Sequence, residues 1–249
     1  MTDSTPNRLK DKTAIVTGAA RGIGEATVRR LVADGANVVF SWAHSEKLAL
    51  NLANELTTNE SSVIAMKADN SRPDEIRSLF ERVENQIGPF DIVVNNAGIG
   101  WDKPITDMPL SEFEQLIQVN LIGTFVCLQE AARRIQDHGR IITISSGHTR
   151  QISPGAGPLS ATKAGIEELT KALALEIAPR RVTVNAVRPN LIESTGITPE
   201  VREAIANQIA AVPLGGLGQT FDVANTIAFL ASSDARWITG SVIDVNGGL

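Results

Sequence analysis

The stretch Thr17–Gly24, which reads TGAARGIG, has residue types suited to binding a phosphate group. It follows a short apolar run, Thr13–Val16, and precedes a segment in which apolar residues recur at helical spacing. A strand, a glycine turn and a helix in this order place backbone N–H groups and the positive helix end against a pyrophosphate. Gly18 allows the sharp turn, Gly22 lets the backbone approach the phosphates, and Gly24 lets the helix pack closely against the strand. The alternative interpretation is an ordinary strand-to-helix turn.

Other polar residues stand where predicted strands end. The run Asn95–Gly98 follows one apolar strand, Ser145–Ser146 ends another, and Arg188–Asn190 follows a third. Asn120 lies inside a helical stretch, although asparagine is a poor helix former, and Lys163 lies one turn into a predicted helix. Ligands of parallel sheets bind outside the carboxyl ends of the strands. We therefore expect these side chains to lie around one binding site.

The elements that would position these residues alternate between strand and helix. The predicted strands are Thr13–Val16, Asn37–Ser41, Val63–Lys67, Asp91–Asn95, Arg140–Ser145, Val182–Val187 and Val242–Val245. After the helix that follows the glycine turn, the predicted helices are Glu46–Leu56, Pro73–Ile87, Pro109 to about Gln136 in two segments meeting near Asn120, Pro158 to about Ile177, Pro199–Ile209 and Phe221–Leu230. Repeated strand–helix units predict an α/β fold in a single domain over residues 1–249, a Rossmann-type doubly wound parallel sheet with helices on both faces.

Composition narrows the class of protein. The 249 residues are 43% hydrophobic and 20% charged, which suits a sizeable core, and the formal net charge of -5 argues against a nucleic-acid or anionic-membrane partner. Cys127 is the only cysteine, so an intrachain disulfide and a cysteine-based metal site are excluded. The sequence shows no signal-peptide core and no membrane-spanning run, so we expect a cytoplasmic protein.

The order of the motifs resembles the short-chain dehydrogenase/reductase family, close to its keto-reductase branch. The matching motifs are Thr17–Gly24 (TGxxxGxG), Asn95–Gly98 (NNAG), Val119-Asn120, Gly139–Ser146 (GRIITISS), Ala161–Gly165 (ATKAG), Val184–Pro189 (VNAVRP) and Val245–Gly248 (VNGG). The resemblance covers the chain from about Lys10 onward. It implies an oxidoreductase that uses a nicotinamide cofactor and forms a homotetramer.

The second strand bears on the choice of cofactor. An acidic residue about twenty positions past the glycines would hold the ribose hydroxyls of NAD, but Phe40–Ser45 contains none. Arg21 offers a guanidinium that suits a phosphate, so we expect NADP(H); a solvated surface charge is the alternative. The motifs and the resemblance together indicate these cofactor-binding residues: Gly18, Arg21, Gly22, Ile23, Gly24, Ser41, His44, Ser45, Asp69, Asn70, Asn96, Ala97, Gly98, Lys163, Pro189, Ile192 and Ser194.

The chemistry of the family depends on an Asn, a Ser, a Tyr and a Lys, of which Asn120, Ser146 and Lys163 match three. In the family pattern, Tyr lies four residues before Lys on the same helix face. The ammonium lowers the pKa of the phenol, which passes a proton to or from the substrate oxygen during hydride transfer. Leu159 occupies that position here, and the chain contains no tyrosine. Because leucine cannot transfer a proton, the usual proton route is absent.

A replacement proton donor has three candidates. His148 has a suitable unperturbed pKa of about 6.5, although a histidine in a loop is more often a surface residue. Ser160 points about 100° away from Leu159 around the helix. A water held by Lys163 is the third candidate, and Lys163 could equally serve only to hold the nicotinamide ribose.

Two segments resemble the family's substrate-binding parts. Asn190–Val212 matches a mobile substrate lid, and Gly98–Pro104 matches the edge of the pocket. Apolar side chains in these segments, together with Leu159, suggest an apolar carbonyl or alcohol substrate; they are Trp101, Leu191, Ile192 and Ile197. The same side chains could instead be packing within the lid.

Three functions are open on this sequence. The first is an NADP(H)-dependent oxidoreductase with an altered proton route, which Asn120, Ser146 and Lys163 favour. The second is a catalytically impaired pseudoenzyme that binds NADP(H) as a sensor or partner subunit. The third is an isomerase or lyase on the same scaffold, and Leu159 favours these last two.

The expected homotetramer has a reason in the sequence as well. The long helices around residues 111–136 and 158–177 carry more apolar residues than one sheet face obviously covers, and symmetric pairing would bury the excess. On the second helix these residues are Ile166, Leu169, Ala172, Leu173 and Ile177.

Overall fold

The computed structural model describes residues 7–58, 61–193 and 197–249. Its strands are β1 (Thr13–Val16), β2 (Asn37–Trp42), β3 (Val63–Lys67), β4 (Ile92–Asn95), β5 (Arg140–Ile144), β6 (Thr183–Pro189) and β7 (Val242–Val245). Its α-helices are α1 (Gly22–Ala33), α2 (Glu46–Leu56), α3 (Pro73–Gln86), α4 (Leu110–Leu116), α5 (Gly123–Arg134), α6 (Gly157–Glu176), α7 (Pro199–Ala204), α8 (Ala206–Ala210) and α9 (Thr220–Ala231). A π-helical segment, Ile117–Ile122, joins α4 to α5.

All of these strands belong to one parallel sheet in the order β3-β2-β1-β4-β5-β6-β7. The central strands are short runs of apolar and β-branched residues that are buried on both faces, as parallel strands require. The strand order reverses between β1 and β4: from β1 to β3 the chain moves to one edge of the sheet, and from β4 to β7 it moves to the other. Ligands bind at such a switch point in folds of this kind. The predicted doubly wound α/β fold is confirmed.

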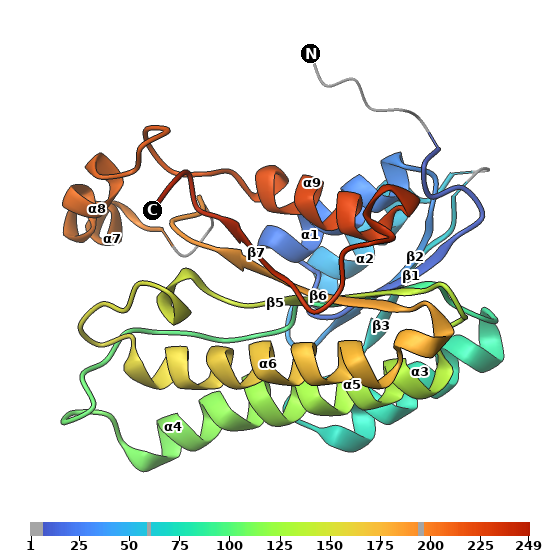
Figure 1. Ribbon diagram of the computed structural model, residues 1–249, viewed down its shortest axis with the longest axis horizontal. Helices are drawn as coiled ribbons and strands as arrows, with labels where there is room; N and C mark the ends of the chain where they lie inside the picture. The colour runs from blue at the N-terminus through green and yellow to red at the C-terminus, as the bar shows by residue number, and fades with distance from the viewer. Residues whose placement is uncertain (1–6, 59–60, 194–196) are drawn as a thin grey trace.

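Helices cover both faces of the sheet (Figure 1). On one face α1, α2 and α9 pack over a core that includes Leu31, Leu52 and Ile227. On the other face α3, α5 and α6 pack over a second core that includes Phe80 and Val126. The carboxyl ends of the strands are therefore held between two rigid layers.

The prediction of one continuous helix over Pro199–Ile209 is wrong. The structure divides it into α7 and α8 at Ile205, whose φ of -103° and ψ of 12° leave the helical region. No residue of either helix is fully buried. Because tertiary packing of an apolar face supplies most helical stability, this exposed segment has little to hold it as one helix.

The apolar residues expected on α6 divide between the core and the surface. Ile166 is fully buried, and Leu169, Leu173 and Ile177 are half-buried against the second core. Ala172 is exposed, as are the larger side chains of Phe125 on α5 and Leu175 on α6. Among the described residues, no helix has the length and apolar character needed to cross a membrane.

Candidate active site

The glycine turn after β1 is closely packed at Gly18 and Gly24 and open at Gly22. Gly18 and Gly22 both have a φ of 63°, which favours glycine. A Cβ on Gly18 would lie 2.7 Å from the Cα of Ala97, and a Cβ on Gly24 would lie 2.6 Å from Nδ2 of Asn96. A Cβ on Gly22 would meet only open space. The turn is thus held against the residues after β4 and opens outward at Gly22, as a phosphate cradle must.

Two predicted cofactor residues support this turn directly. Asn96 Nδ2 donates to the carbonyl oxygens of Thr17 at 3.0 Å and Gly18 at 2.9 Å. The Oγ of Ser41, which is buried, accepts a hydrogen bond from the N–H of Gly18 at 3.1 Å. These side chains orient the backbone of the cradle.

Basic side chains are exposed at the start of α1 and just after β2. Arg21 is exposed at the start of α1, and His44 is exposed just after β2. Trp42 ends β2 with 8% of its surface exposed, and Nζ of Lys67 lies 5.8 Å from its ring centroid. Sequence reasoning missed Trp42 and Lys67, because their pairing depends on the register of β2 against β3.

Asp69 and Asn70, predicted to bind the cofactor, form hydrogen bonds within the protein. Asp69 Oδ1 accepts from the N–H of Ser71 at 2.8 Å. Asn70 is buried, and its Nδ2 donates to the carbonyl of Val119 at 2.8 Å. The side chain of Asn70 therefore fixes the π-helical segment.

That segment places Asn120 fully inside the molecule. Asn120 Oδ1 accepts from the N–H of Ile99 at 2.9 Å, and its Nδ2 donates to the carbonyl of Ile99 at 2.8 Å and to Oγ1 of Thr162 at 3.2 Å. The helical break expected near Asn120 is confirmed as a π-helical turn, a feature that is frequent at functional sites. Asn120 ties the loop after β4 to α6.

Lys163 lies on the inner face of α6, against the end of β5. Its Nζ donates to the carbonyl of Ile144 at 2.8 Å. Burial lowers the pKa of the Lys163 ammonium from 10.5 to about 8. Leu159 lies one turn earlier on the same face, half-buried, and a Cβ on Gly100 would be 2.9 Å from its Cδ2. Leu159 thus faces the edge of the predicted pocket.

Ser146 is half-buried at the start of a tight turn, Gly147–Thr149, that follows β5. The N–H of His148 donates to its Oγ at 3.4 Å. The ring of His148 is half-buried, with Nδ1 3.4 Å from Oγ of Ser153 and Nε2 4.0 Å from Oδ1 of Asp102. His148 therefore lies between two loops of the site, and Asp102 is a neighbour that sequence reasoning missed.

Ser160 has a structural task. Its Oγ donates to the backbone carbonyl of His148 at 2.9 Å, and the side chain is buried. This bond directs the Ser160 hydroxyl to the loop after β5, away from Leu159. The structure thus gives Ser160 a role in holding His148 in place.

Comparison with known proteins places this geometry in a family. A family model described as enoyl-(acyl carrier protein) reductase matches residues 18–249. A 3-oxoacyl-[acyl-carrier-protein] reductase of Staphylococcus aureus (strain Mu50) is 40% identical over 243 residues, covering 96% of this chain and 98% of the relative. The corresponding protein of Aquifex aeolicus (strain VF5) is 41% identical over 249 residues, covering 97% and 98%.

Solved structures agree with the sequence relatives. A short-chain dehydrogenase of Burkholderia cenocepacia J2315 in complex with NADP superposes with a TM-score of 0.93 at 32% identity, covering 97% of this chain and 99% of the other. A blue fluorescent protein from a metagenomic library in complex with NADPH gives a TM-score of 0.92 at 35% identity, covering 97% and 98%.

The chain belongs to the short-chain dehydrogenase/reductase family. It is an oxidoreductase by that membership, and the family uses NAD(P)(H). The glycine cradle, with its open side at Gly22, fits such a cofactor. In this short-chain dehydrogenase/reductase, Pro189 ends β6, and Ile192 pairs with Gly218 and packs against the first core. Ser194 lies outside the described residues.

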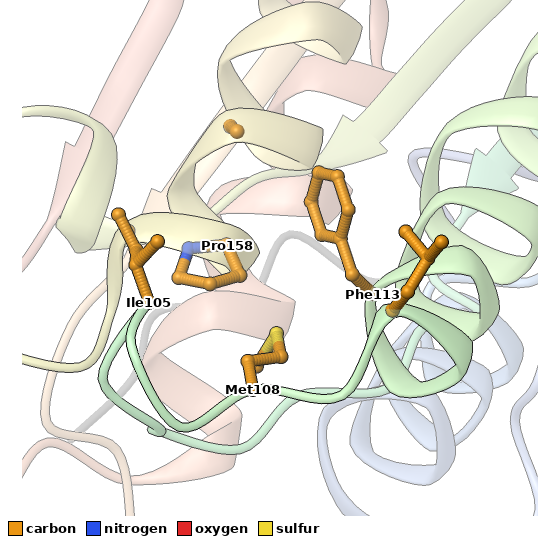
Figure 2. Close-up of a pocket in the computed structure, with 7 residues that line it drawn as sticks. Ile105, Met108, Phe113 and Pro158 are labelled. Carbon is orange, nitrogen blue, oxygen red and sulfur yellow. The ribbon is translucent and has the colours of Figure 1, made fainter.

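An apolar hollow of about 310 Å³ lies outside this site. Figure 2 shows Ile105, Met108, Phe113 and Pro158 around it, between the loop after β4 and the start of α6. Ala161, which also lines it, is two residues from Lys163 and so lies about 160° away around the helix. The hollow is therefore on the outer face of α6, away from Lys163.

Proposed function

We propose that the protein is an NADP(H)-dependent oxidoreductase that interconverts an apolar ketone or aldehyde and its alcohol, with a proton route that bypasses residue 159. The observation that carries this proposal is the buried Lys163. Its ammonium is fixed by the carbonyl of Ile144, next to the π-helical segment of Asn120 and the loop of Ser146. A protein that only needed a folded scaffold would gain nothing from burying an ammonium there, because burial of a charge is unfavourable.

The phosphate of NADP(H) has a cationic place to bind. Arg21 stands exposed at the cradle, β2 ends without an acid, and Lys67 lies beside Trp42. A guanidinium matches a phosphate by charge and by its forked donors. The Burkholderia neighbour with NADP and the metagenomic neighbour with NADPH support the same choice.

The chemical step divides among the residues around the substrate oxygen. Bound NADPH would supply the hydride that adds to the carbonyl carbon. Ser146 would donate a hydrogen bond to the carbonyl oxygen, and Lys163 would hold the nicotinamide ribose. His148, whose Nε2 lies 4.0 Å from Oδ1 of Asp102, would then give a proton to the oxygen, and solvent would restore that proton. A water on Lys163 is the competing donor.

The segment Asn190–Val212 would cover the substrate as a lid. Its described part includes α7 and α8, which Figure 1 shows at one end of the molecule, apart from the two helical layers. Leu191 and Ile192, together with Leu159 and Trp101, would give the pocket its apolar character. An apolar pocket excludes water from the reacting carbonyl.

The test is NADPH oxidation across a panel of ketones, aldehydes and quinones, run beside calorimetric titration with NADPH. We expect micromolar binding and a slow turnover that falls further in His148→Gln. Tight NADPH binding without turnover of any compound would favour the second candidate, a cofactor-binding pseudoenzyme, for which Leu159 is the supporting observation. Failure to bind NADPH would reject both.

A further inference from the structure

A buried carboxylate lies directly behind the Ser146 loop. Glu167 is four residues after Lys163 on the same face of α6, with 6% of its surface exposed. It accepts hydrogen bonds from Oγ of Ser145, from Oγ1 of Thr149 at 2.7 Å and from Nη2 of Arg188 at 2.9 Å. Ser145 and Thr149 belong to the loop after β5 and Arg188 to the end of β6, all at the carboxyl edge of the sheet. Glu167 thus joins this loop, β6 and α6 at one point.

The charge of Glu167 is compensated by a chain of ions that leads to the surface. Arg188 Nη1 also donates to Oδ1 of Asp244 at 2.9 Å, and Arg150 Nη1 donates to Oδ2 of Asp244. The exposed fractions of the Arg188, Asp244 and Arg150 side chains rise outward, from 14% through 24% to 60%. Burial raises the pKa of Glu167, but the hydrogen bonds from Arg188, Ser145 and Thr149 outweigh burial and hold that pKa below its usual value.

The residues that Glu167 holds are the ones on either side of Ser146. Ser145 precedes Ser146, and Oγ1 of Thr149 lies 3.0 Å from the carbonyl oxygen of Ser146 as well as 2.7 Å from Glu167. Between them, Gly147 packs so closely on Asn190 that a Cβ there would lie 2.5 Å from the Asn190 side chain. The Ser146 backbone is therefore fixed from the side of α6 and from the end of β6.

We propose that Glu167 is a positioning residue of the active site, which aims the Ser146 hydroxyl at the substrate oxygen through Ser145 and Thr149. The inference rests on the proposed reductase function. A hydrogen bond to the substrate oxygen depends on placement, and a shift of about 1 Å can lower a rate by about 100-fold. A carboxylate that only stabilised the fold would be satisfied by partners anywhere, whereas these partners bracket Ser146.

The test compares Glu167→Gln with Glu130→Gln, a matched control. Glu130 on α5 is also buried and also paired with arginine, in its case with Arg133 at 3.2 Å and Arg134 at 2.9 Å. Both variants lose one buried carboxylate charge, but Glu130 has no bond to the Ser146 loop among the described contacts. Assays are run well below both melting temperatures, with ketone kcat and KM and the NADPH dissociation constant measured separately.

We expect kcat of Glu167→Gln to fall about 10- to 100-fold with NADPH binding unchanged, and Glu130→Gln to lose stability alone. Hydrogen exchange of the 145–153 peptide should speed up in Glu167→Gln and stay unchanged in Glu130→Gln. Thr149→Val removes one hydrogen-bond donor to Glu167 and no charge, so its kcat should fall less. This variant replaces Glu167→Gln in the test if Glu167→Gln does not fold.

Equal kcat in Glu167→Gln and wild type, or equal losses in both Glu→Gln variants, would overturn the positioning role. If the wild type reduces no compound of the panel, the proposed function has failed. The hydrogen-exchange experiment alone then tests whether Glu167 holds the Ser146 loop in place. Unchanged exchange over 145–153 in Glu167→Gln and Thr149→Val would then reject it.

Discussion

Leu159 is the residue at which the proposed chemistry is tested most directly. It lies one turn before Lys163 and packs closely against Gly100. Leu159→Tyr places a phenol beside the Lys163 ammonium, which lowers the phenol's pKa towards working pH. We expect ketone reduction by NADPH to rise about 10²–10⁴-fold, the usual span of general acid catalysis.

The matched control is Leu159→Phe, which has the same ring without the hydroxyl. Both rings add volume and can destabilise the fold by about 1–3 kcal/mol, so melting temperatures are measured first. Single-turnover reduction of a ketone panel then compares the variants. Equal rates for the Tyr and Phe variants would show that the site has diverged beyond the loss of its acid.

Arg21, at the glycine turn, allows a test of the choice of cofactor. Arg21→Ala removes a charged hydrogen bond to the phosphate of NADP(H), and we expect NADPH binding to weaken by about 1–3 kcal/mol with NADH binding nearly unchanged. Calorimetric titration of both cofactors measures this, with the exposed Arg236→Ala as the control. A wild type that binds NADH as tightly as NADPH would refute the preference.

Lys163 gives the fold a pH dependence with a definite sign. Its pKa is lowered to about 8 by burial, so between about pH 8 and its unfolded pKa of about 10.4 the unfolded chain binds more protons and stability rises with pH. Relative to Lys163→Met, the wild type should gain about 3 kcal/mol across this window. Urea unfolding at several pH values measures the difference, with the exposed Lys171→Met as control. Parallel profiles of the wild type and Lys163→Met would contradict the burial effect.

The junction of α3, the π-helical segment and α5 allows a test at the level of elements. A Cβ on Gly123 would lie 2.2 Å from the carbonyl oxygen of Asn70, which is backbone and cannot move aside. We expect Gly123→Ala to destabilise the fold by at least about 1–3 kcal/mol. In the control, Gly157→Ala, the nearest atom is 3.4 Å away on the flexible side chain of Ile105, so it should be tolerated. Equal melting temperatures for the two variants would refute this reading of the junction.

The elements could be predicted largely because their signals are local. A few neighbouring residues are enough to recognise the apolar runs of β1 and β4 and the glycine turn. The poor helix former Asn120 likewise indicated the π-helical break. The continuity of Pro199–Ile209 could not be judged, because it depends on whether anything packs against that segment.

The part of the site that escaped prediction is held together by long-range contacts. Arg188 meets Glu167 from 21 positions away and Asp244 from 56 positions away, and neither spacing has a sequence signature. Asn70 and Ser41 were expected to face a ligand. Their side chains bond to backbone groups that only the folded register brings near.

For the whole molecule, the expected homotetramer depends on the outer surface shared by α5 and α6, which includes Ala172 of the predicted set. Phe125 and Leu175 are exposed, and Phe125 borders a shallow groove between α5 and α6 with Gln129 and Ala172. We propose that a second copy packs on this face by a two-fold axis, as isologous interfaces do. The apolar hollow at Ile105 and Pro158 continues the same outer side of α6.

Phe125→Glu puts a charge at the centre of that face, and burying an unpaired charge is strongly unfavourable. We expect light scattering to give a tetramer for the wild type and a smaller species for Phe125→Glu at micromolar concentration. Leu48→Glu, at an equally exposed position on α2, should leave the assembly intact. A monomeric wild type would reject the tetramer outright.

The three tryptophans, in a chain without tyrosine, make this protein its own optical probe. Trp42 is buried at the end of β2, Trp101 is half-buried in the loop after β4, and Trp237 is 90% exposed. Ultraviolet emission therefore comes from indole alone, and reduced nicotinamide absorbs in the band where indole emits. Cofactor binding would quench indole emission by energy transfer, and Trp237→Phe removes the emission of the exposed indole. The fluorescence of Trp42 and Trp101 then reports cofactor binding in real time, without an attached label.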